Sequence, residues 1–285
     1  MSSKPMQLSA ALTWGRQQLK ASSDTAKLDA ELLLIDILHC SRAQLIAFPE
    51  RMLTPAEFKA YQHFMARRRR SEPLAYIVEH KEFWSLDLRV TPATLIPRPE
   101  TELLVELLLQ FFAKDKTSRR IADLGTGCGA VALALSQERP IWEVYATDQS
   151  EAALVVAKQN AATFGIKGVQ FFQGSWCAAL PSVLFDAILS NPPYLSEAEW
   201  KGGQKELCFE PVSALVSKEN GFQDLREITR SAKEYLQPGG YLLLEHGSEQ
   251  AAEVRRILQK EAYLAVCSYH DLAGRERVTG GRWAI

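Results

Sequence analysis

The stretch from Ile121 to Leu135 restricts the possible folds more than any other part of this chain. It reads as a strand, then a turn with glycines at positions 125, 127 and 129, then an alanine- and leucine-rich helix. Glycine lets the backbone turn tightly and approach a ligand closely. In open α/β sheets, ligands bind outside the carboxyl ends of the strands. The stretch therefore predicts an α/β fold with a ligand at this turn, although its glycine spacing differs from the dinucleotide fingerprint Gly-x-Gly-x-x-Gly.

The chain after residue 120 repeats this alternation of strand and helix. We expect strands near residues 120–124, 143–147, 168–172, 185–190 and 240–246, and helices near residues 129–137, 150–163, 222–236 and 249–260. This order is typical of a doubly wound, mostly parallel α/β sheet. The tail differs, because residues 263–269 and 277–285 read as two successive strands with no helix between them. We therefore expect a C-terminal hairpin that adds one antiparallel strand.

Residues 1–72 predict a small bundle of four or five helices. Apolar side chains recur at helical spacing from Leu8 to Leu19 and from Leu28 to Leu38, and residues 42–48 predict a short helix. Thr54-Pro55 opens another helix, with threonine as the cap and proline at the first helical position. A core this small is marginal alone, so we expect the bundle to depend on the larger domain or on a partner.

The bundle ends in four consecutive arginines, Arg67–Arg70. We interpret them as a solvated helix end whose charges suit the helix dipole. The alternative is a contact with an acidic partner or with RNA bound to that partner. Residues 73–92 predict a β-hairpin connector whose strands include Tyr76–Val78 and Leu86–Val90. The α/β domain then spans residues 93–285.

Composition excludes several classes of protein. The chain has 285 residues, 47% of them hydrophobic and 24% charged, as in ordinary globular proteins. A net charge of −1 gives no global field that attracts polyanions, which argues against nucleic acid as the main substrate. The five cysteines are scattered without metal-site spacing, so we expect reduced thiols in a cytoplasmic protein and no metal. No apolar run is long enough to span a bilayer.

Asn191–Tyr194, an Asn-Pro-Pro-Tyr tetrapeptide after the predicted strand 185–190, suits the methylation of a planar NH₂ group. Such a nitrogen is a poor nucleophile because its lone pair is delocalised. The Asn191 side-chain oxygen and the Pro192 carbonyl can accept hydrogen bonds from the two hydrogens of this NH₂ group and rotate the group. Pro193 stiffens the turn by fixing φ, and Tyr194 offers a face on which a flat group can stack. The alternative interpretation is a proline-rich turn that Asn191 merely caps.

Three predicted strand ends converge on one nucleoside site. Asp148 ends the second strand, about twenty residues past the glycine turn, where an acidic residue accepts hydrogen bonds from ribose hydroxyls. It can also act as a helix cap. Gly125, Asp148 and Asn191 all lie at the carboxyl ends of predicted strands, so they face one crevice. The glycine turn does not separate a pyrophosphate from S-adenosylmethionine, and the Asn-Pro-Pro-Tyr motif decides for S-adenosylmethionine.

From about Arg67 to the C-terminus, the chain resembles the release-factor glutamine methyltransferase family. The resemblance rests on the segments Glu72–Ile77 with Glu82–Trp84, Leu95–Glu102, Asp123–Ala130, and Asn191–Tyr194 with Phe209–Pro211. The second segment is the most specific, because the related ribosomal-protein glutamine methyltransferases read Arg-Ser-Pro at Arg98–Glu100. The chain departs from the family at Ser71 and Glu79, where glycine is common. These departures concern the backbone of the connector rather than the chemistry.

The resemblance implies a Rossmann-like S-adenosylmethionine-dependent methyltransferase. Its implied substrate is the glutamine of the Gly-Gly-Gln tripeptide in bacterial peptide chain release factors, bound by the N-terminal bundle and methylated by direct in-line transfer. It implies that Asn191, Pro192 and Tyr194 are catalytic and that Asn191–Tyr194 binds substrate. The cofactor residues that it implies are Gly125, Thr126, Gly127, Cys128, Gly129, Asp148, Trp176 (beside the adenine, or else in the core) and Asn191.

Two further residues are singled out near this site. Arg98 either shapes the cofactor site or forms a structural salt bridge, and Glu210 is interpreted as a loop anchor rather than a base. We expect a monomer that acts on release factors, with no membrane partner and no nucleic acid substrate. The alternatives are a ribosomal-protein glutamine methyltransferase, disfavoured by Pro99-Glu100, and a nucleic-acid adenine methyltransferase, which would need a basic groove. A binding module without catalysis would not need the Asn-Pro-Pro-Tyr motif.

Overall fold

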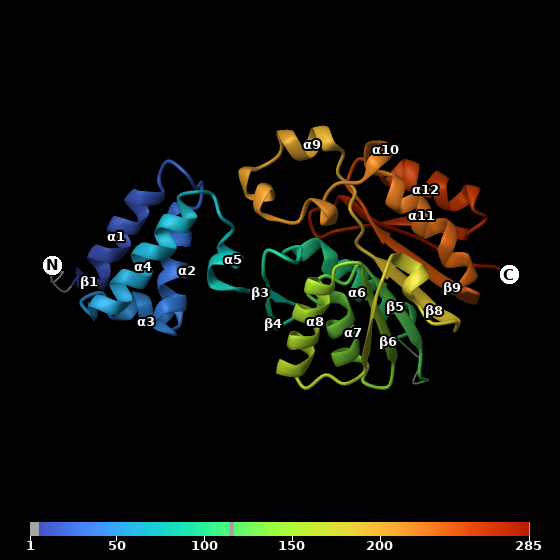
Figure 1. Cartoon of the computed structure of the whole chain (residues 1–285), viewed down its shortest axis with the longest axis horizontal. Coiled ribbons are helices and arrows are strands. Elements are labelled where there is room, and N and C mark those ends of the chain that lie inside the picture. The colour runs from blue at the N-terminus through green and yellow to red at the C-terminus, as the bar shows by residue number, and fades with distance from the viewer. Residues whose placement is uncertain (1–5, 114–116, 285) are drawn as a thin grey trace. The chain divides into compact units, whose positions relative to one another are not determined.

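The computed structural model describes residues 6–113 and 117–284 and divides into two compact units, the first ending at Glu79 and the second beginning at His80 (Figure 1). The first unit is helical. Its helices are α1 (Leu8–Leu19), α2 (Ala26–Leu38), α3 (Arg42–Ala47), α4 (Pro55–Arg68) and α5 (Leu74–Val78). The predicted helices are therefore confirmed. A short antiparallel ribbon of β1 (Met6–Gln7) and β2 (Met52–Leu53) was not predicted.

Apolar side chains from all five helices form the core of the first unit. The buried members are Leu8, Ala11, Leu19, Leu33, Leu34, Leu45, Leu53, Tyr61, Met65 and Ile77. Tyr61 is fully buried and donates its hydroxyl to the Ala30 carbonyl at 3.2 Å. A Cβ at Gly15 would lie 2.0 Å from that hydroxyl oxygen, so only glycine fits in α1 beside this ring. Thr54 caps α4 in a reciprocal capping box with Glu57, as the sequence predicted.

The predicted strand at Tyr76–Val78 is wrong, because these residues form part of helix α5. Pro73 precedes the helix, and Glu79 ends it in the left-handed region at φ +64°. Ser71 also has a positive φ, of +65°. These are the two positions where the family commonly carries glycine, which adopts such angles without steric cost. The observed hairpin is shorter and consists of β3 (His80–Phe83) and β4 (Leu86–Arg89).

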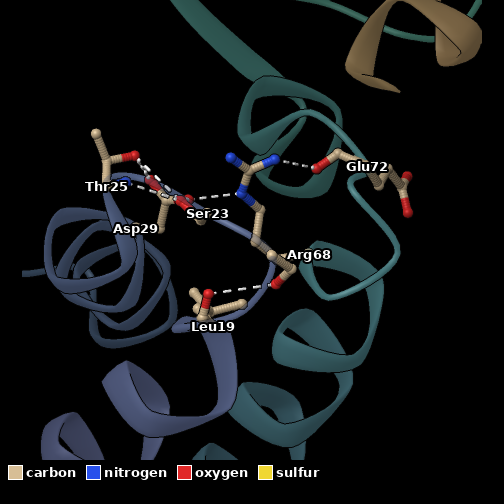
Figure 2. Close-up of polar contacts among 7 residues, drawn as sticks. Leu19, Ser23, Thr25, Asp29, Arg68 and Glu72 are labelled. Atoms are coloured by element: carbon tan, nitrogen blue, oxygen red, sulfur yellow. Dashed lines mark hydrogen bonds and ion pairs between the residues drawn. The ribbon is translucent and has the colours of Figure 1, made fainter. Parts of the chain in front are cut away.

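The interpretation of Arg67–Arg70 as a solvated helix end is wrong for the first two arginines. Arg67 forms an ion pair with Glu72 at 2.6 Å and donates to the Tyr76 carbonyl at 3.0 Å. Arg68 is 6% exposed, and its Nε lies 2.6 Å from Asp29 on α2 (Figure 2). The hydroxyls of Ser23 and Thr25 donate to the same carboxylate, each at 2.8 Å. These arginines hold the bundle together.

In the described part of the second unit, seven strands form one sheet in the order β10-β11-β9-β8-β5-β6-β7. The strands are β5 (Arg120–Leu124), β6 (Glu143–Asp148), β7 (Val169–Gln173), β8 (Phe185–Ser190), β9 (Leu236–Glu245), β10 (Leu264–His270) and β11 (Glu276–Arg282). Neighbouring pairs from β9 to β7 are parallel, and β11 is antiparallel to both β9 and β10. This confirms the predicted doubly wound sheet and its antiparallel C-terminal strand.

The helices that flank this sheet are α6 (Glu102–Phe111), α7 (Ala130–Glu138), α8 (Glu151–Thr163), α11 (Gln223–Ser231) and α12 (Ala251–Lys260) (Figure 1). Two short helices, α9 (Glu197–Gly202) and α10 (Lys218–Gly221), lie in the long connection between β8 and β9. Short 3₁₀ turns lie at Pro99–Thr101, Trp176–Ala179, Lys205–Phe209, Val212–Ala214 and Ala232–Glu234. Within the described ranges, no helix has the length and apolar character required to cross a membrane.

The parallel strands bring the predicted site segments to one edge of the sheet. Leu124 pairs with Thr147 on one side and with Ser190 on the other, so the residues that follow these three strands emerge side by side. The buried Ser190 hydroxyl donates to the Leu124 carbonyl at 2.7 Å. The loops after β5 and β8 are thereby fixed to each other.

Candidate active site

A cavity of about 300 Å³ opens at the carboxyl edge of the sheet. Its walls come from the ends of four parallel strands, from the segment that precedes the Arg98 region, and from a loop near residue 212. The lining residues are Pro92–Leu95, Gly125, Gly127, Asp148–Ser150, Ala152, Ala153, Gly174–Trp176, Asn191, Pro193, Pro211, Ser213 and Ala214. The predicted convergence of Gly125, Asp148 and Asn191 on one crevice is observed.

The glycine turn has the backbone that its composition requires. Gly125, Gly127 and Gly129 have φ values of +73°, +57° and +89°. The NH groups of Gly125 and Thr126 both donate to the Thr147 carbonyl at 2.9 Å, which ties the turn to the end of β6. A Cβ at Gly125 would lie 3.0 Å from the Trp176 ring. Glycine therefore allows both the left-handed turn and the close approach of Trp176.

Thr126 points away from the cavity and into the fold. Its hydroxyl donates to Asp123 at 2.6 Å, and the same carboxylate oxygen accepts from the Ala132 NH at 3.2 Å. Burial raises the pKa of Asp123 to about 6, although both hydrogen bonds oppose the shift. Asp123 therefore ties the start of helix α7 to the glycine turn. Its hydrogen bond with Thr126 stabilises the turn from inside the fold.

Cys128 and Gly129 do not line the cavity among the residues described. Cys128 is buried, and burial raises the pKa of its thiol to about 12. Its carbonyl accepts from Asn160 at 2.9 Å, and Asn160 also exchanges hydrogen bonds with the backbone of Arg89 in β4. A Cβ at Gly129 would lie 3.3 Å from Ala157 on α8. Both residues pack the turn against its neighbours.

Asp148 lies on the cavity wall at the end of β6. Its two carboxylate oxygens accept from the NH groups of Gly127 and Ser150, each at 2.9 Å. Burial raises the pKa of Asp148, and these two hydrogen bonds oppose the shift. Ser150, rather than Asp148, caps helix α8 by accepting from the Ala153 NH. Each carboxylate oxygen retains a lone pair, so Asp148 can also accept from a ligand hydroxyl.

Asn191 lies between two cavities. A second cavity, of about 350 Å³, is lined by Leu95, Arg98, Asn191, Tyr194, Leu195, Glu199, Leu207, Ala214, Leu215, Gly247–Gln250 and Arg277. Asn191 belongs to both walls, whereas Pro193 lines the first cavity and Tyr194 the second. The Asn191 Nδ2 donates to the Thr101 hydroxyl at 3.1 Å. Pro192 is buried.

The loop that carries Tyr194 is also held by the segment that follows β9. The Gln250 side chain donates to the Tyr194 carbonyl at 2.9 Å. A Cβ at Gly221 would lie 2.1 Å from the same oxygen, so glycine is required there. The Tyr194 hydroxyl lies 3.4 Å from Glu245. Burial raises the pKa of Tyr194, and the nearby Glu245 raises it further.

Arg98 forms the structural salt bridge that was one of its two interpretations. Its guanidinium pairs with Glu210, whose side chain is 1% exposed. The second oxygen of Glu210 accepts from the Ile96 NH at 3.1 Å. Glu210 therefore anchors the loop at residues 209–211 to the segment that contains Ile96, as predicted. Arg98 also lines the second cavity.

Several wall residues were not predicted. Pro92, Ala93, Thr94, Ser213 and Ala214 reach the cavity from loops, and no local pattern distinguishes them from other loops. Thr101 and Glu245 were also missed. Glu245 follows the rule that selected Asp148 and Asn191, because it is the last residue of a parallel strand. A search of every strand end for polar residues would have found it.

Two family models and several named proteins match this chain. Residues 10–78 match the family described as PrmC N-terminal domain, and residues 101–210 match the family described as Methyltransferase small domain. A protein named release factor glutamine methyltransferase from Coxiella burnetii is 47% identical over 266 residues, 93% of this chain and 95% of that protein. Its namesake from Shewanella oneidensis is 44% identical over 273 residues, 96% of this chain and 95% of that protein.

The chain belongs to the release factor glutamine methyltransferase family. As a member of this family it is an enzyme, a methyltransferase. Solved structures of lower identity share its fold. A methyltransferase from Pyrococcus furiosus is 19% identical, with a TM-score of 0.54, and the match covers 77% of this chain and 99% of that chain. A 16S rRNA methyltransferase from Thermus thermophilus, in complex with AdoMet and guanosine, is 18% identical, with a TM-score of 0.53 and coverage of 71% and 49%.

The described residues of this family member contain no group of three or more His, Cys, Asp and Glu side chains placed to hold a metal ion. All five cysteines are free thiols. His246, which follows β9, is buried, and both of its ring nitrogens are engaged, with the Gly247 carbonyl at 2.8 Å and the Thr279 hydroxyl at 2.7 Å. The polar side chains that line the two cavities include the amide of Asn191, the carboxylates of Asp148, Glu199 and Glu249, and the guanidinium groups of Arg98 and Arg277.

Proposed function

We propose that this enzyme methylates the side-chain amide nitrogen of a glutamine in bacterial peptide chain release factors, with S-adenosylmethionine as methyl donor. The observation that supports this most strongly is the position of Asn191 in the walls of two adjoining cavities. One cavity is lined by the glycine turn, Asp148 and Trp176, and the other by Tyr194 and polar side chains. Relatives that match over nearly the whole chain carry the corresponding name.

The first cavity fits S-adenosylmethionine. The proposed cofactor contacts are Asp148 to the ribose hydroxyls, Trp176 against the adenine, and Gly125 and Gly127 where the backbone must come close. The solved neighbour from Thermus thermophilus holds AdoMet within the same fold. When bound, this cofactor supplies a methyl group that its positively charged sulfur has already activated. Thr126, Cys128 and Gly129 support the turn in our proposal instead of touching the cofactor.

The substrate amide enters the second cavity and meets Asn191. The Asn191 Oδ1 and the Pro192 carbonyl accept hydrogen bonds from the substrate NH₂ and turn its nitrogen lone pair toward the methyl group. Tyr194 supports the flat amide. Alignment of nitrogen, methyl carbon and sulfur, with water excluded, can supply several kcal/mol of the barrier. The nitrogen gains a methyl group and loses one proton to Asn191, Pro192 or water, so no strong general base is needed.

We propose that the substrate glutamine lies in a Gly-Gly-Gln tripeptide and that the domains divide the work. In this proposal the bundle of residues 1–72 binds the release factor, residues 73–92 connect, and residues 93–285 carry out the transfer. The match of residues 10–78 to a named N-terminal domain of this family supports the existence of a separate N-terminal domain. The two glycines give the substrate loop the conformational freedom to approach the second cavity.

The test is methyl transfer from labelled S-adenosylmethionine to a release factor, offered beside ribosomal proteins, bulk DNA and bulk RNA. Mass spectrometry then locates the methyl group. A release factor whose Gly-Gly-Gln glutamine is replaced by glutamate serves as the matched control and should accept no label. Label on the Gly-Gly-Gln glutamine supports the proposal. Label only on nucleic acid or on a ribosomal protein would overturn the substrate and leave the fold and cofactor site standing.

A further inference from the structure

Two arginines that have no role in the mechanism above line the second cavity. Arg98 directly precedes the 3₁₀ turn at Pro99–Thr101, and Arg277 is the second residue of β11. Both side chains belong to the wall that also contains Asn191 and Tyr194. A guanidinium group has five N–H donors and no acceptor. This wall can therefore donate hydrogen bonds to a ligand that lies next to Asn191.

Each of the two guanidinium groups is held at one end by a buried carboxylate. The Nη2 of Arg98 pairs with Glu210, whose side chain is 1% exposed. The Nε of Arg277 donates to Asp271 at 3.2 Å, and that side chain is 6% exposed. An arginine anchored in this way has lost part of its rotational freedom before a ligand arrives, so it loses less on binding. The two carboxylates preorganise both arginines.

The other ends of the two guanidinium groups make no contact of this kind. Among the described residues, no acceptor takes a hydrogen bond from the Arg277 Nη1 or Nη2, or from the Arg98 Nε or Nη1. The Arg277 side chain is nevertheless only 16% exposed. Donors in such surroundings are normally hydrogen-bonded. A ligand in the second cavity can supply the missing acceptors.

The charges around this cavity favour a neutral acceptor over an anion. Glu199 and Glu249 lie on the same wall as the two arginines, which are also paired with the carboxylates of Glu210 and Asp271. Carboxylates therefore outnumber guanidinium groups at the second cavity. A phosphate or a carboxylate ligand would meet this excess of negative charge. A peptide carbonyl carries no net charge and still accepts hydrogen bonds from arginine.

We propose that Arg98 and Arg277 bind main-chain carbonyl oxygens of the substrate loop beside the target glutamine. This inference rests on the proposed function and deepens it, because it assigns the recognition of the two glycines. Glycine has no side chain, so a Gly-Gly pair can be recognised only through its peptide groups. The two arginines hold the carbonyls while Asn191 accepts from the glutamine NH₂. The same wall disfavours the phosphates that a nucleic acid substrate would bring.

The test compares three variants of the full chain in the methyl-transfer assay with release factor. Arg277→Gln removes the guanidinium, and Asp271→Asn removes its ionic anchor but keeps the guanidinium. Arg275→Gln is the matched control, because this exposed arginine lies in the same turn and lines neither cavity. We expect kcat/KM for release factor to fall roughly tenfold or more for Arg277→Gln, as for a lost hydrogen bond to a charged group.

The other two variants and the cofactor provide the contrast. The kcat/KM should fall much less for Asp271→Asn and stay near the wild-type value for Arg275→Gln. Calorimetric affinity for S-adenosylmethionine should be unchanged in all three. A purely structural role of Arg277 predicts instead equal losses for Arg277→Gln and Asp271→Asn, because both variants break the same ion pair.

A competition experiment separates a peptide from a phosphate as the ligand of these arginines. Short single-stranded DNA and RNA oligonucleotides are added to the wild-type enzyme and to Arg277→Gln as competitors of release factor. We expect no competition that depends on Arg277. Competition in the wild type that Arg277→Gln abolishes would show that the arginine binds phosphate, and this would overturn the proposal.

The remaining results separate the possible failures. Arg277→Gln with the kcat/KM of Arg275→Gln, or with the same loss as Asp271→Asn, would overturn the proposal. If Arg277→Gln does not bind S-adenosylmethionine, its fold is damaged and Arg277→Lys decides. Lysine keeps the charge beside Asp271 but not the fork of donors, so an undiminished kcat/KM would also overturn the proposal. A wild-type enzyme that labels no glutamine would instead overturn the proposed function itself.

Discussion

Buried carboxylates in the two units of this enzyme have different surroundings. In the helical unit, the buried carboxylate of Asp29 lies 2.6 Å from Arg68 and accepts two hydroxyls, so its charge is paired and solvated by the protein. At the sheet edge, the carboxylates of Asp123 and Glu245 are as deeply buried, yet no described residue forms an ion pair with either. Burial raises their pKa values to about 6 and about 7.

The difference lies between paired and unpaired carboxylates and not between whole units, because the buried Glu210 of the second unit is paired with Arg98. A buried ion pair makes the fold depend on both of its partners, because removal of one partner leaves the other charge buried without compensation. An unpaired buried carboxylate weakens the fold in its ionised form and is therefore expected where the chemistry needs it. Asp123 accepts from the Thr126 hydroxyl in the glycine turn, and Glu245 lies 3.4 Å from the hydroxyl of Tyr194.

The largest expected effect comes from breaking the pair in the bundle. Arg68→Met should destabilise the first unit by about 3–5 kcal/mol, because it leaves Asp29 buried without its cation. Hydrogen exchange of the full chain, followed by mass spectrometry, would show this as lost protection in α2 and α4. Arg51→Met is the matched control, since Arg51 is 42% exposed in its pair with Glu57. Its loss should stay below about 1 kcal/mol. Equal losses for the two variants would contradict the distinction.

The second effect concerns turnover in the other unit. Asn191→Ala removes the proposed acceptor and should lower kcat roughly 100- to 1,000-fold, as removal of one preorganised hydrogen-bonding group in an active site commonly does. Binding of S-adenosylmethionine should persist, because the glycine turn, Asp148 and Trp176 are unchanged. Single-turnover kinetics and calorimetry would separate the two quantities. Normal turnover would remove Asn191 from its role.

The third prediction has the opposite sign to the first, because removal of the Glu245 charge at the sheet edge should stabilise the fold. Folded-state Glu245 has a pKa of about 7 against an ordinary value of 4.5, so the stability that it contributes is fully present below pH 4.5 and is lost as the pH rises through 7. Glutamine imitates the protonated form. At pH 8, Glu245→Gln should be more stable than wild type by about 1–3 kcal/mol, with little difference near pH 4.5. Thermal unfolding of the full chain at both pH values measures this, and a variant that unfolds earlier at pH 8 contradicts it.

The smallest effect is expected at Asp148, whose carboxylate already accepts two backbone NH groups. Asp148→Ala should weaken binding of S-adenosylmethionine about tenfold, as expected for the loss of one charge-assisted hydrogen bond. The kcat at saturating cofactor should change much less. Isothermal calorimetry gives the affinity directly. An unchanged affinity would show that Asp148 only braces the glycine turn.

Most of the architecture of both units could be predicted because its signals are local. The glycine turn, the strand–helix alternation and the capping box at Thr54 each depend on residues a few positions apart. The strand at Tyr76–Val78 failed for the same reason. Its apolar residues suit either a short strand or a short helix, and the left-handed Glu79 that ends α5 has no signal of its own.

The sequence by itself determined the fold class, the glycine turn and the tetrapeptide Asn191–Tyr194, because short-range sterics and hydrogen bonding impose these patterns. Only the tertiary structure decided which distant polar groups meet. Arg68 reaches Asp29 over 39 positions, and Asn191 reaches Thr101 over 90. Such pairs depend on strand order and on how helices pack, and the sequence around a residue does not indicate its distant partner. The tetrapeptide therefore lies in one loop, whereas the hydroxyl that accepts from its Asn191 amide, that of Thr101, comes from a distant part of the chain.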